Sequence, residues 1–180
     1  MNILLFGVTN IGKTTVGELL AKELGYAFYD LDEEVKARCH VTLEQFVNTG
    51  SLIERDRTRG DILGVILEKG GSKVIAVTPM YYSRNFSKYF KREDVLPVEL
   101  QDAPEHILDR LVFGDENDRL YKDDEYRDAH RAYYLREIKK DITCYKKAFA
   151  RILNKYQMDG DPPEAVVRGL IEQFGLEKVL

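Results

Sequence analysis

The chain has 180 residues and a formal net charge of −4 at pH 7. This length suits one domain with a substantial core, and we expect a single domain over residues 1–180. An acidic balance argues against a general nucleic-acid or membrane surface, because both select basic faces. Cys39 and Cys144 lack metal-ligand spacing, and the start MNILLFG lacks the basic region of a signal peptide. We therefore expect a cytoplasmic protein with no membrane or nucleic-acid partner.

The first predicted element is a strand over Asn2–Phe6, which is a short apolar run. The loop GVTNIGKTT follows it, and apolar residues then recur at helical spacing over Val16–Leu24. Gly25 comes directly afterwards, as expected of a residue that ends a helix. A strand, a loop and a helix in this order are the context that the pattern G-x-x-x-x-G-K-[ST] requires.

This loop predicts a phosphate site. Glycines let the backbone turn tightly enough for its amides to face phosphate oxygens, and the N-terminus of the following helix adds partial positive charge. In such a loop the lysine reaches the outer phosphates and the next hydroxyl binds magnesium, which assigns these roles to Lys13 and Thr14. The residues expected to bind the nucleotide are Gly7, Asn10, Ile11, Gly12, Lys13, Thr14 and Thr15.

Two carboxylates, Asp30 and Asp32, directly follow a second predicted strand at Tyr26–Tyr29. Ligands of open α/β sheets collect at the carboxyl ends of strands, and we expect both side chains to project there. One would hold magnesium, and the other would accept the proton of an acceptor hydroxyl. A structural alternative stays open, because Asp32-Glu33-Glu34 would also cap a following helix.

Helical patterns alternate with short strands along the rest of the chain, which predicts a parallel sheet wrapped by helices. The further predicted elements are helices at Leu43–Val47, Asp56–Glu68 and Tyr81–Phe90 and strands at Lys73–Val77 and Val95–Leu100. In the second of these helices, the residues expected to face inward are Ile62, Leu63, Val65, Ile66 and Leu67. Gly70-Gly71 is expected to end that helix, and Asp161 is expected to cap a last one.

Residues 113–127, FGDENDRLYKDDEYR, are dense in charge and poor in aliphatic side chains. This composition predicts a solvated loop. A loop of this length inside a compact domain is usually functional, and in a phosphate-transferring fold it is where a mobile lid closes over the nucleotide. The alternative is a plain surface loop.

The motif GVTNIGKTT, the segment YDLDEEV and the helix start GSLIERDR occur in an order that resembles the shikimate kinase family. The likeness extends to the region of Arg119 and to DGDPPEAVV near the end of the chain. It implies a three-layer P-loop NTPase fold, with a five-stranded parallel sheet flanked by helices and a mobile lid. It also implies a phosphotransferase that uses ATP and Mg²⁺ and acts on a small hydroxylated carboxylic acid, with shikimate as the default acceptor.

By this resemblance, Lys13 and Thr14 contact the phosphates and magnesium. Asp30 supports the metal ion, and Asp32 orients the acceptor hydroxyl. The resemblance thus gives a catalytic role to Lys13 and Asp32 and a metal-binding role to Thr14 and Asp30.

The remaining assignments also come from the resemblance. Arg55 matches the arginine that binds the substrate carboxylate in the family, and Arg119 matches the catalytic lid arginine near the transferring phosphate. Arg110 is similar to the arginine that stacks on the nucleotide. Thr78 lies where the family contacts its acceptor, and we expect it to do so here.

Two departures from the family pattern fall on the acceptor side. The family has a glycine triplet after the third strand, where this chain reads Val77-Thr78-Pro79-Met80. The family also has a second carboxylate-binding arginine on a late helix, and the matching place holds Asp141, which would repel a carboxylate. Lys139 and Lys140 are neighbouring candidates to replace that arginine.

The leading hypothesis is a monomeric, magnesium-dependent kinase that transfers the γ-phosphate of ATP to a small-molecule acceptor. An alternative of a different class is a nucleotide-binding regulatory or sensor protein that has kept the loop and lost catalysis. A third possibility is a kinase of a neutral or cationic metabolite, because Asp141 would suit such an acceptor.

Overall fold

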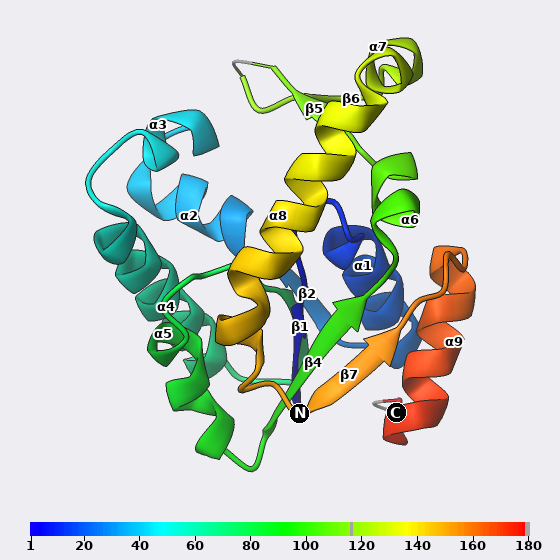
Figure 1. Cartoon of the computed structure of the whole chain (residues 1–180). Helices are drawn as coiled ribbons and strands as arrows, with labels where there is room; N and C mark the ends of the chain where they lie inside the picture. Colours follow the sequence, from blue (N-terminus) through cyan, green and yellow to red (C-terminus); the bar gives the residue numbers. More distant parts are fainter. Residues whose placement is uncertain (116, 179–180) are drawn as a thin grey trace.

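The computed structural model describes residues 1–115 and 117–178. Its main sheet has five strands in the order β2-β3-β1-β4-β7, all parallel, with helices on both faces (Figure 1). These strands are β1 (Asn2–Phe6), β2 (Ala27–Asp30), β3 (Lys73–Ala76), β4 (Val95–Gln101) and β7 (Asn154–Gln157). The predicted five-stranded parallel sheet is confirmed.

The helices vary in length from the 4 residues of α5 to the 19 residues of α8. In the described residues the α-helices are α1 (Lys13–Leu24), α2 (Leu31–Cys39), α3 (Leu43–Val47), α4 (Leu52–Glu68), α5 (Arg84–Ser87), α6 (Pro104–Asp109), α7 (Asp124–Ala129), α8 (Arg131–Phe149) and α9 (Pro163–Phe174). A 3₁₀-helix, η1, spans Lys88–Lys91. Of these helices, none combines the length and the apolar character that a membrane crossing needs.

The two faces of the sheet bury different side chains of β1, because successive residues of a strand point to opposite sides. Leu5 lies on the face that α1 covers, close to Gly17 of that helix. Phe6 lies on the other face and contacts the rings of Phe86, Phe90 and Phe149, which come from α5, η1 and α8. Both faces of β1 are therefore closed to water, which explains why its sequence is an unbroken apolar run.

Most predicted elements lie within a few residues of the observed ones, and β1 and α3 have the predicted bounds. The helix predicted at Asp56 begins earlier, at Leu52, because Ser51 and Glu54 form a capping box at its start. Val65 was predicted to face inward, and this is wrong. Its side chain is exposed, because the buried stripe of α4 runs through Ile62, Leu63, Ile66 and Leu67.

Four further predictions need correction. The helix predicted at Tyr81–Phe90 is instead the short α5 followed by η1. The cap of α9 is Pro162 rather than Asp161, and it makes no side-chain cap bond. Lys69 rather than Gly70-Gly71 is the C-cap of α4. Between residues 113 and 127, where a loop was predicted, the chain forms a β5–β6 hairpin and the start of α7.

The arrangement in Figure 1 places two groups of short elements beyond the carboxyl ends of the strands. One group is α2 and α3. The other is α7 with the hairpin of β5 (Phe113–Gly114) and β6 (Leu120–Tyr121). Ligands bind at this edge in open parallel sheets.

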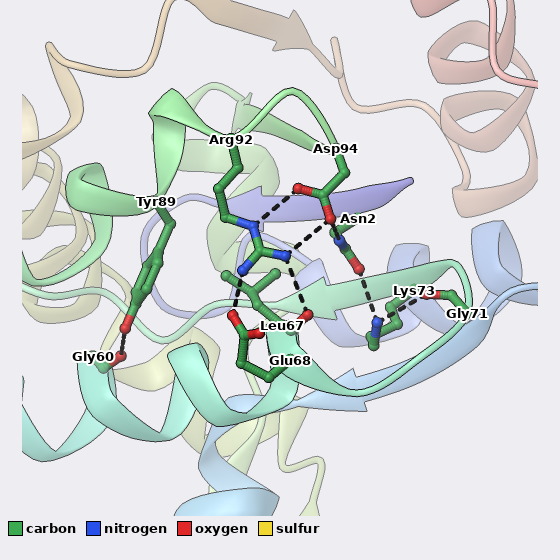
Figure 2. A network of polar contacts seen from close by, with 9 residues as sticks. All are labelled: Asn2, Gly60, Leu67, Glu68, Gly71, Lys73, Tyr89, Arg92 and Asp94. Atoms are coloured by element: carbon green, nitrogen blue, oxygen red, sulfur yellow. Dashed lines mark hydrogen bonds and ion pairs between the residues drawn. The ribbon is translucent and has the colours of Figure 1, made fainter.

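A polar network fixes the opposite, amino-terminal edge of the sheet (Figure 2). The buried Lys73 donates to Asn2 Oδ1 at 3.1 Å and to the carbonyl of Gly71 at 2.8 Å. Asn2 donates in turn to Asp94, which also accepts from Arg92. These bonds join the starts of β1, β3 and β4, and they satisfy a lysine that burial would otherwise penalise.

Replacing Gly60 by alanine is expected to lower the free energy of unfolding by about 1–3 kcal/mol. A Cβ at this position of α4 would lie 2.6 Å from the carbonyl oxygen of Asn85, so the backbone would have to shift. Equilibrium unfolding in urea measures the change. Gly70→Ala is the matched control, because nothing lies within 4 Å of its Cβ position. Equal losses in the two variants would contradict this packing argument.

Candidate active site

The loop between β1 and α1 has the backbone of an anion cradle. Gly7, Asn10 and Gly12 have φ values of 145°, 62° and 107°, which favour glycine or asparagine. A Cβ on Gly7 would lie 2.9 Å from the carbonyl oxygen of Leu100, so only glycine fits this close approach to β4. These conformations curl the loop around the start of α1.

The amino end of α1 leaves its first amides free of a side-chain cap, because the N-cap residue is Gly12. Lys13 lies beside them, and its ammonium group donates to the carbonyls of Gly7 and Val8, both at 2.9 Å. Burial lowers the pKa of Lys13 to about 8, while the charges of Asp32 and Asp30 oppose the shift. The loop thus holds a cation and free amides at one place, which suits an anionic ligand.

Asp30 connects the loop to the second strand. One carboxylate oxygen accepts a hydrogen bond of 2.7 Å from the Thr14 hydroxyl. The other accepts from the backbone amides of Asp32 and Glu33, at 2.9 and 3.4 Å, and so caps α2. The residue that caps this helix is therefore Asp30, and not the group Asp32-Glu33-Glu34 that the sequence left open.

Asp32 lies in the first turn of α2 rather than on an extended strand end, as the alternation had suggested. Its carboxylate accepts a hydrogen bond of 2.8 Å from the hydroxyl of Thr78. Burial raises the pKa of Asp32, while the bond from Thr78 and the charge of Arg59 act in the opposite direction. Two expected acceptor-side residues, far apart in the sequence, are thus in direct contact.

The segment after β3 is closely packed. The backbone amide of Val77 donates a hydrogen bond of 2.9 Å to the carbonyl of Leu5. The side chains of Val77 and Met80 are both fully buried. The bulk that the sequence adds at these two positions therefore lies in the core. Thr78 and Pro79 remain partly exposed between them.

Arg55 lies at the start of α4 and is already hydrogen-bonded. Its Nη1 donates to the carbonyls of Gly50 and Thr49, at 2.8 and 3.4 Å. With Phe46, Glu54 and others, it lines an open surface pocket with a volume of ≈ 310 Å³. The Arg55 side chain therefore stabilises the turn between α3 and α4.

Arg59, one turn further along α4, was missed by the sequence reasoning. It is buried, its guanidinium lies 5.1 Å from the centre of the Phe46 ring, and its charge acts on Asp32. The sequence did contain one indication of Arg59. It lies four residues after Arg55 on the same helix, and residues four apart lie on the same side of a helix.

The inner side of α8 carries Asp141 and Tyr145. Burial raises the pKa of Asp141, and the charge of Glu137 adds to the shift. Lys139 and Lys140, the candidates to replace the missing arginine, are both exposed, and Lys140 lies 3.6 Å from a carboxylate oxygen of Glu137.

Comparisons with known proteins identify the family of this chain. A model of the shikimate kinase family matches residues 9–174. The chain belongs to the shikimate kinase family. A curated shikimate kinase of Geobacter sulfurreducens is 36% identical over 128 residues, which cover 67% of this chain and 66% of that relative.

Solved shikimate kinases share the fold of the family over nearly the whole chain. The structure from Aquifex aeolicus is 26% identical, with a TM-score of 0.69, and the match covers 97% of this chain and 96% of that one. The structure from Acinetobacter baumannii, in complex with shikimate, is 20% identical, with a TM-score of 0.70 and coverages of 96% and 92%. The predicted family and its P-loop NTPase fold are therefore confirmed.

Residues 113–115 and 117–127 of this family member contact both the helices that follow them and the start of α3. An aromatic cluster connects them to the helices that follow, because the Phe113 ring contacts Tyr121, Tyr126 and Tyr134. Asp118 accepts a hydrogen bond of 2.7 Å from the amide of Leu43. The neighbouring residue, the expected lid arginine Arg119, is exposed.

Arg110 belongs to a second network that the sequence did not reveal. Its Nη1 lies 2.7 Å from the buried Asp102 as an ion pair, although its N–H groups do not point at that oxygen. Asp102 also accepts from the amides of Ala103 and Gly160, at 2.8 and 3.1 Å, and lies 2.7 Å from His106 Nδ1. Burial opposes ionisation, but these bonds hold the pKa of Asp102 below its usual value.

Asp102 therefore ties Arg110 to the loop before α9, and replacing it should disturb the nucleotide contact expected of Arg110. We expect Asp102→Asn to weaken ATP binding about 10-fold, since a lost charge-assisted bond costs about 1.5 kcal/mol. Isothermal titration measures the affinity, and Asp109→Asn, which changes an exposed aspartate at the end of the nearby helix α6, is the control. An unchanged ATP affinity in a folded Asp102→Asn protein would contradict this role.

Proposed function

We propose that this chain is an ATP-dependent kinase that transfers the γ-phosphate to a hydroxyl of shikimate or of a closely similar hydroxylated carboxylic acid. The observation that carries the proposal is the bond between Thr14 and Asp30, which brings the phosphate loop next to Asp32. Membership of the shikimate kinase family supports the reaction class. The curated relative named above is a shikimate kinase, and one solved relative is a shikimate kinase in complex with shikimate.

The donor side fits ATP with Mg²⁺. Magnesium prefers oxygen ligands, and the Thr14 hydroxyl and the Asp30 carboxylate are oxygen donors that lie together beside the uncapped end of α1. When bound, the metal ion would neutralise charge on the phosphates. Lys13 would exchange its two carbonyl partners for phosphate oxygens, and the loop amides from Gly7 to Thr15 would hold the phosphates.

On the acceptor side, we propose that Asp32 orients the reacting hydroxyl and accepts its proton. A raised pKa makes this carboxylate more basic than an exposed aspartate, which favours proton transfer near neutral pH. Thr78 holds one carboxylate oxygen and so restricts the direction of the other. Thr78 is also proposed to contact the acceptor itself, together with Arg55.

The segment 113–127 is proposed to be the lid that brings Arg119 to the transferring phosphate. The contact of Asp118 with the start of α3 supports closure over the site from that side. The whole chain would act as one monomeric domain. We place it in the cytoplasm, and the free thiols of Cys39 and Cys144 support a reducing compartment.

A second candidate function is nucleotide-dependent regulation without catalysis. It is favoured by the acceptor side, where Asp141 replaces an arginine of the family and Arg55 already bonds to backbone carbonyls. Turnover separates the two functions. Binding of ATP with no phosphate transfer to shikimate or to any of a panel of hydroxy acids would favour the regulatory role.

We expect Lys13→Ala to reduce shikimate-dependent release of ADP by about 100-fold or more, because it removes the cation of the phosphate site. A coupled assay with ATP, Mg²⁺ and shikimate measures this rate. Lys22→Ala removes an exposed lysine from the same helix and should leave the rate unchanged. Undiminished transfer in Lys13→Ala would show that the phosphate site is wrongly assigned.

The pH dependence should report the lowered pKa of Lys13. Since the ammonium form pairs with phosphate, and its proton is lost as the pH rises through about 8, kcat/KM for ATP should fall above that pH. Bound phosphates hold the proton on Lys13, so kcat should fall less. The two profiles can be measured between pH 6 and about pH 10, where lysine ordinarily titrates. A kcat/KM that stays level to that upper limit would contradict the assigned titration.

A further inference from the structure

Arg59 is a buried cation whose ion-pair partner in the described residues, Asp56, accepts no hydrogen bond from it. Its side chain is 8% exposed, and the ring of Phe46 covers the guanidinium. Within residues 1–115 and 117–178, no group accepts a hydrogen bond from it, and its Nε is completely buried without a partner. The nearest carboxylate oxygen, Oδ1 of Asp56, is 3.6 Å from Nη1, which is too far for a hydrogen bond.

Asp56 accepts no hydrogen bond from Arg59, and its carboxylate is directed to a backbone amide instead. Its Oδ2 accepts the amide of Tyr82 at 3.0 Å, and its Oδ1 is buried without a hydrogen bond. A buried guanidinium whose donors are unused is costly, and such groups are characteristic of sites that receive a ligand. Only its terminal nitrogens remain within reach of a ligand, since Nε itself is covered in this state.

Arg59 lies on the acceptor side of the site. Its charge acts on the Asp32 carboxylate more strongly than that of Lys13 does. It also acts on Tyr145, where burial is the main cause of a raised pKa and the charge of Asp141 adds to it. The guanidinium is therefore near enough for its charge to act both on the expected proton acceptor on α2 and on Tyr145 of α8.

Arg55 is less suited to the same task. Its Nη1 already donates to two carbonyls of the turn before α4, and releasing them would loosen that turn. A carboxylate would have to compete with these bonds at Arg55, whereas at Arg59 it would meet unused donors.

We propose that Arg59 binds the carboxylate of the acceptor. The inference rests on the proposed kinase function and names the group that recognises the substrate. A planar guanidinium can donate two parallel hydrogen bonds to a carboxylate, which holds the molecule in one orientation. The carboxylate of Asp56 lies 3.6 Å from the same guanidinium and repels a second negative charge. The acceptor is therefore a small hydroxylated acid with a single carboxylate.

The test compares shikimate with its uncharged methyl ester. Titrations are made in the presence of ADP and Mg²⁺ with the wild-type protein, Arg59→Gln and Arg55→Gln. We expect Arg59→Gln to weaken shikimate binding about 10- to 100-fold, as for loss of a charged hydrogen-bonding partner, and to leave binding of the methyl ester nearly unchanged. Arg59→Lys keeps the charge and should recover part of the affinity. Arg57→Gln, an exposed arginine of the same helix, is the matched control.

Thermal unfolding and ATP affinity are measured for each variant, so that a folding defect is recognised. The inference is overturned if Arg59→Gln weakens both compounds equally, if the selective loss appears in Arg55→Gln instead, or if shikimate does not bind the wild-type protein. Selective binding that depends on Arg59 without any phosphate transfer would uphold the inference and refute only the proposed kinase function.

Discussion

The carboxylate of Asp30 is the constraint on which the site depends. It accepts the Thr14 hydroxyl with one oxygen and the first amides of α2 with the other. One side chain therefore fixes the phosphate loop, the end of β2 and the helix that carries Asp32. Because α2 must begin immediately after Asp30, Asp32 falls in its first turn and is directed to Thr78. Asp30 therefore sets the distance between the phosphate loop, on the proposed donor side, and Asp32, on the proposed acceptor side.

The two sides differ in how well their polar groups are satisfied. On the donor side, Lys13 and Thr14 have hydrogen-bond partners in the protein that a ligand can replace. On the acceptor side, Arg59 and Asp56 are buried with unused atoms. Buried polar groups without partners destabilise a fold, and a ligand that satisfies them binds the folded state selectively. The proposed acceptor side is therefore the part of the site where a ligand would satisfy buried polar atoms.

The sequence predicted the parts that depend on local patterns. The strand, the glycine-rich loop and the first helix are contiguous in the sequence. The motif from Gly7 to Thr14 is therefore enough to predict the phosphate loop. Strand β7 was not recognised, because its residues NKYQ lie at the sheet edge and are polar. The roles of Asp102 and Arg59 depend on contacts across the fold, including the amide of Gly160 and the ring of Phe46. The spacing of Arg59 from Arg55 indicates a shared side of the helix, but no pattern along the chain indicates these contacts.

The most direct measurement is a crystal structure of the complex with ADP, Mg²⁺ and shikimate. We expect the shikimate carboxylate to lie about 2.7–3.2 Å from the guanidinium nitrogens of Arg59, with the reacting hydroxyl next to Asp32. We also expect Arg55 to keep its bonds to the turn before α4. A carboxylate held by Arg55, Lys139 or Lys140, with Arg59 still paired only with Asp56, would contradict this assignment.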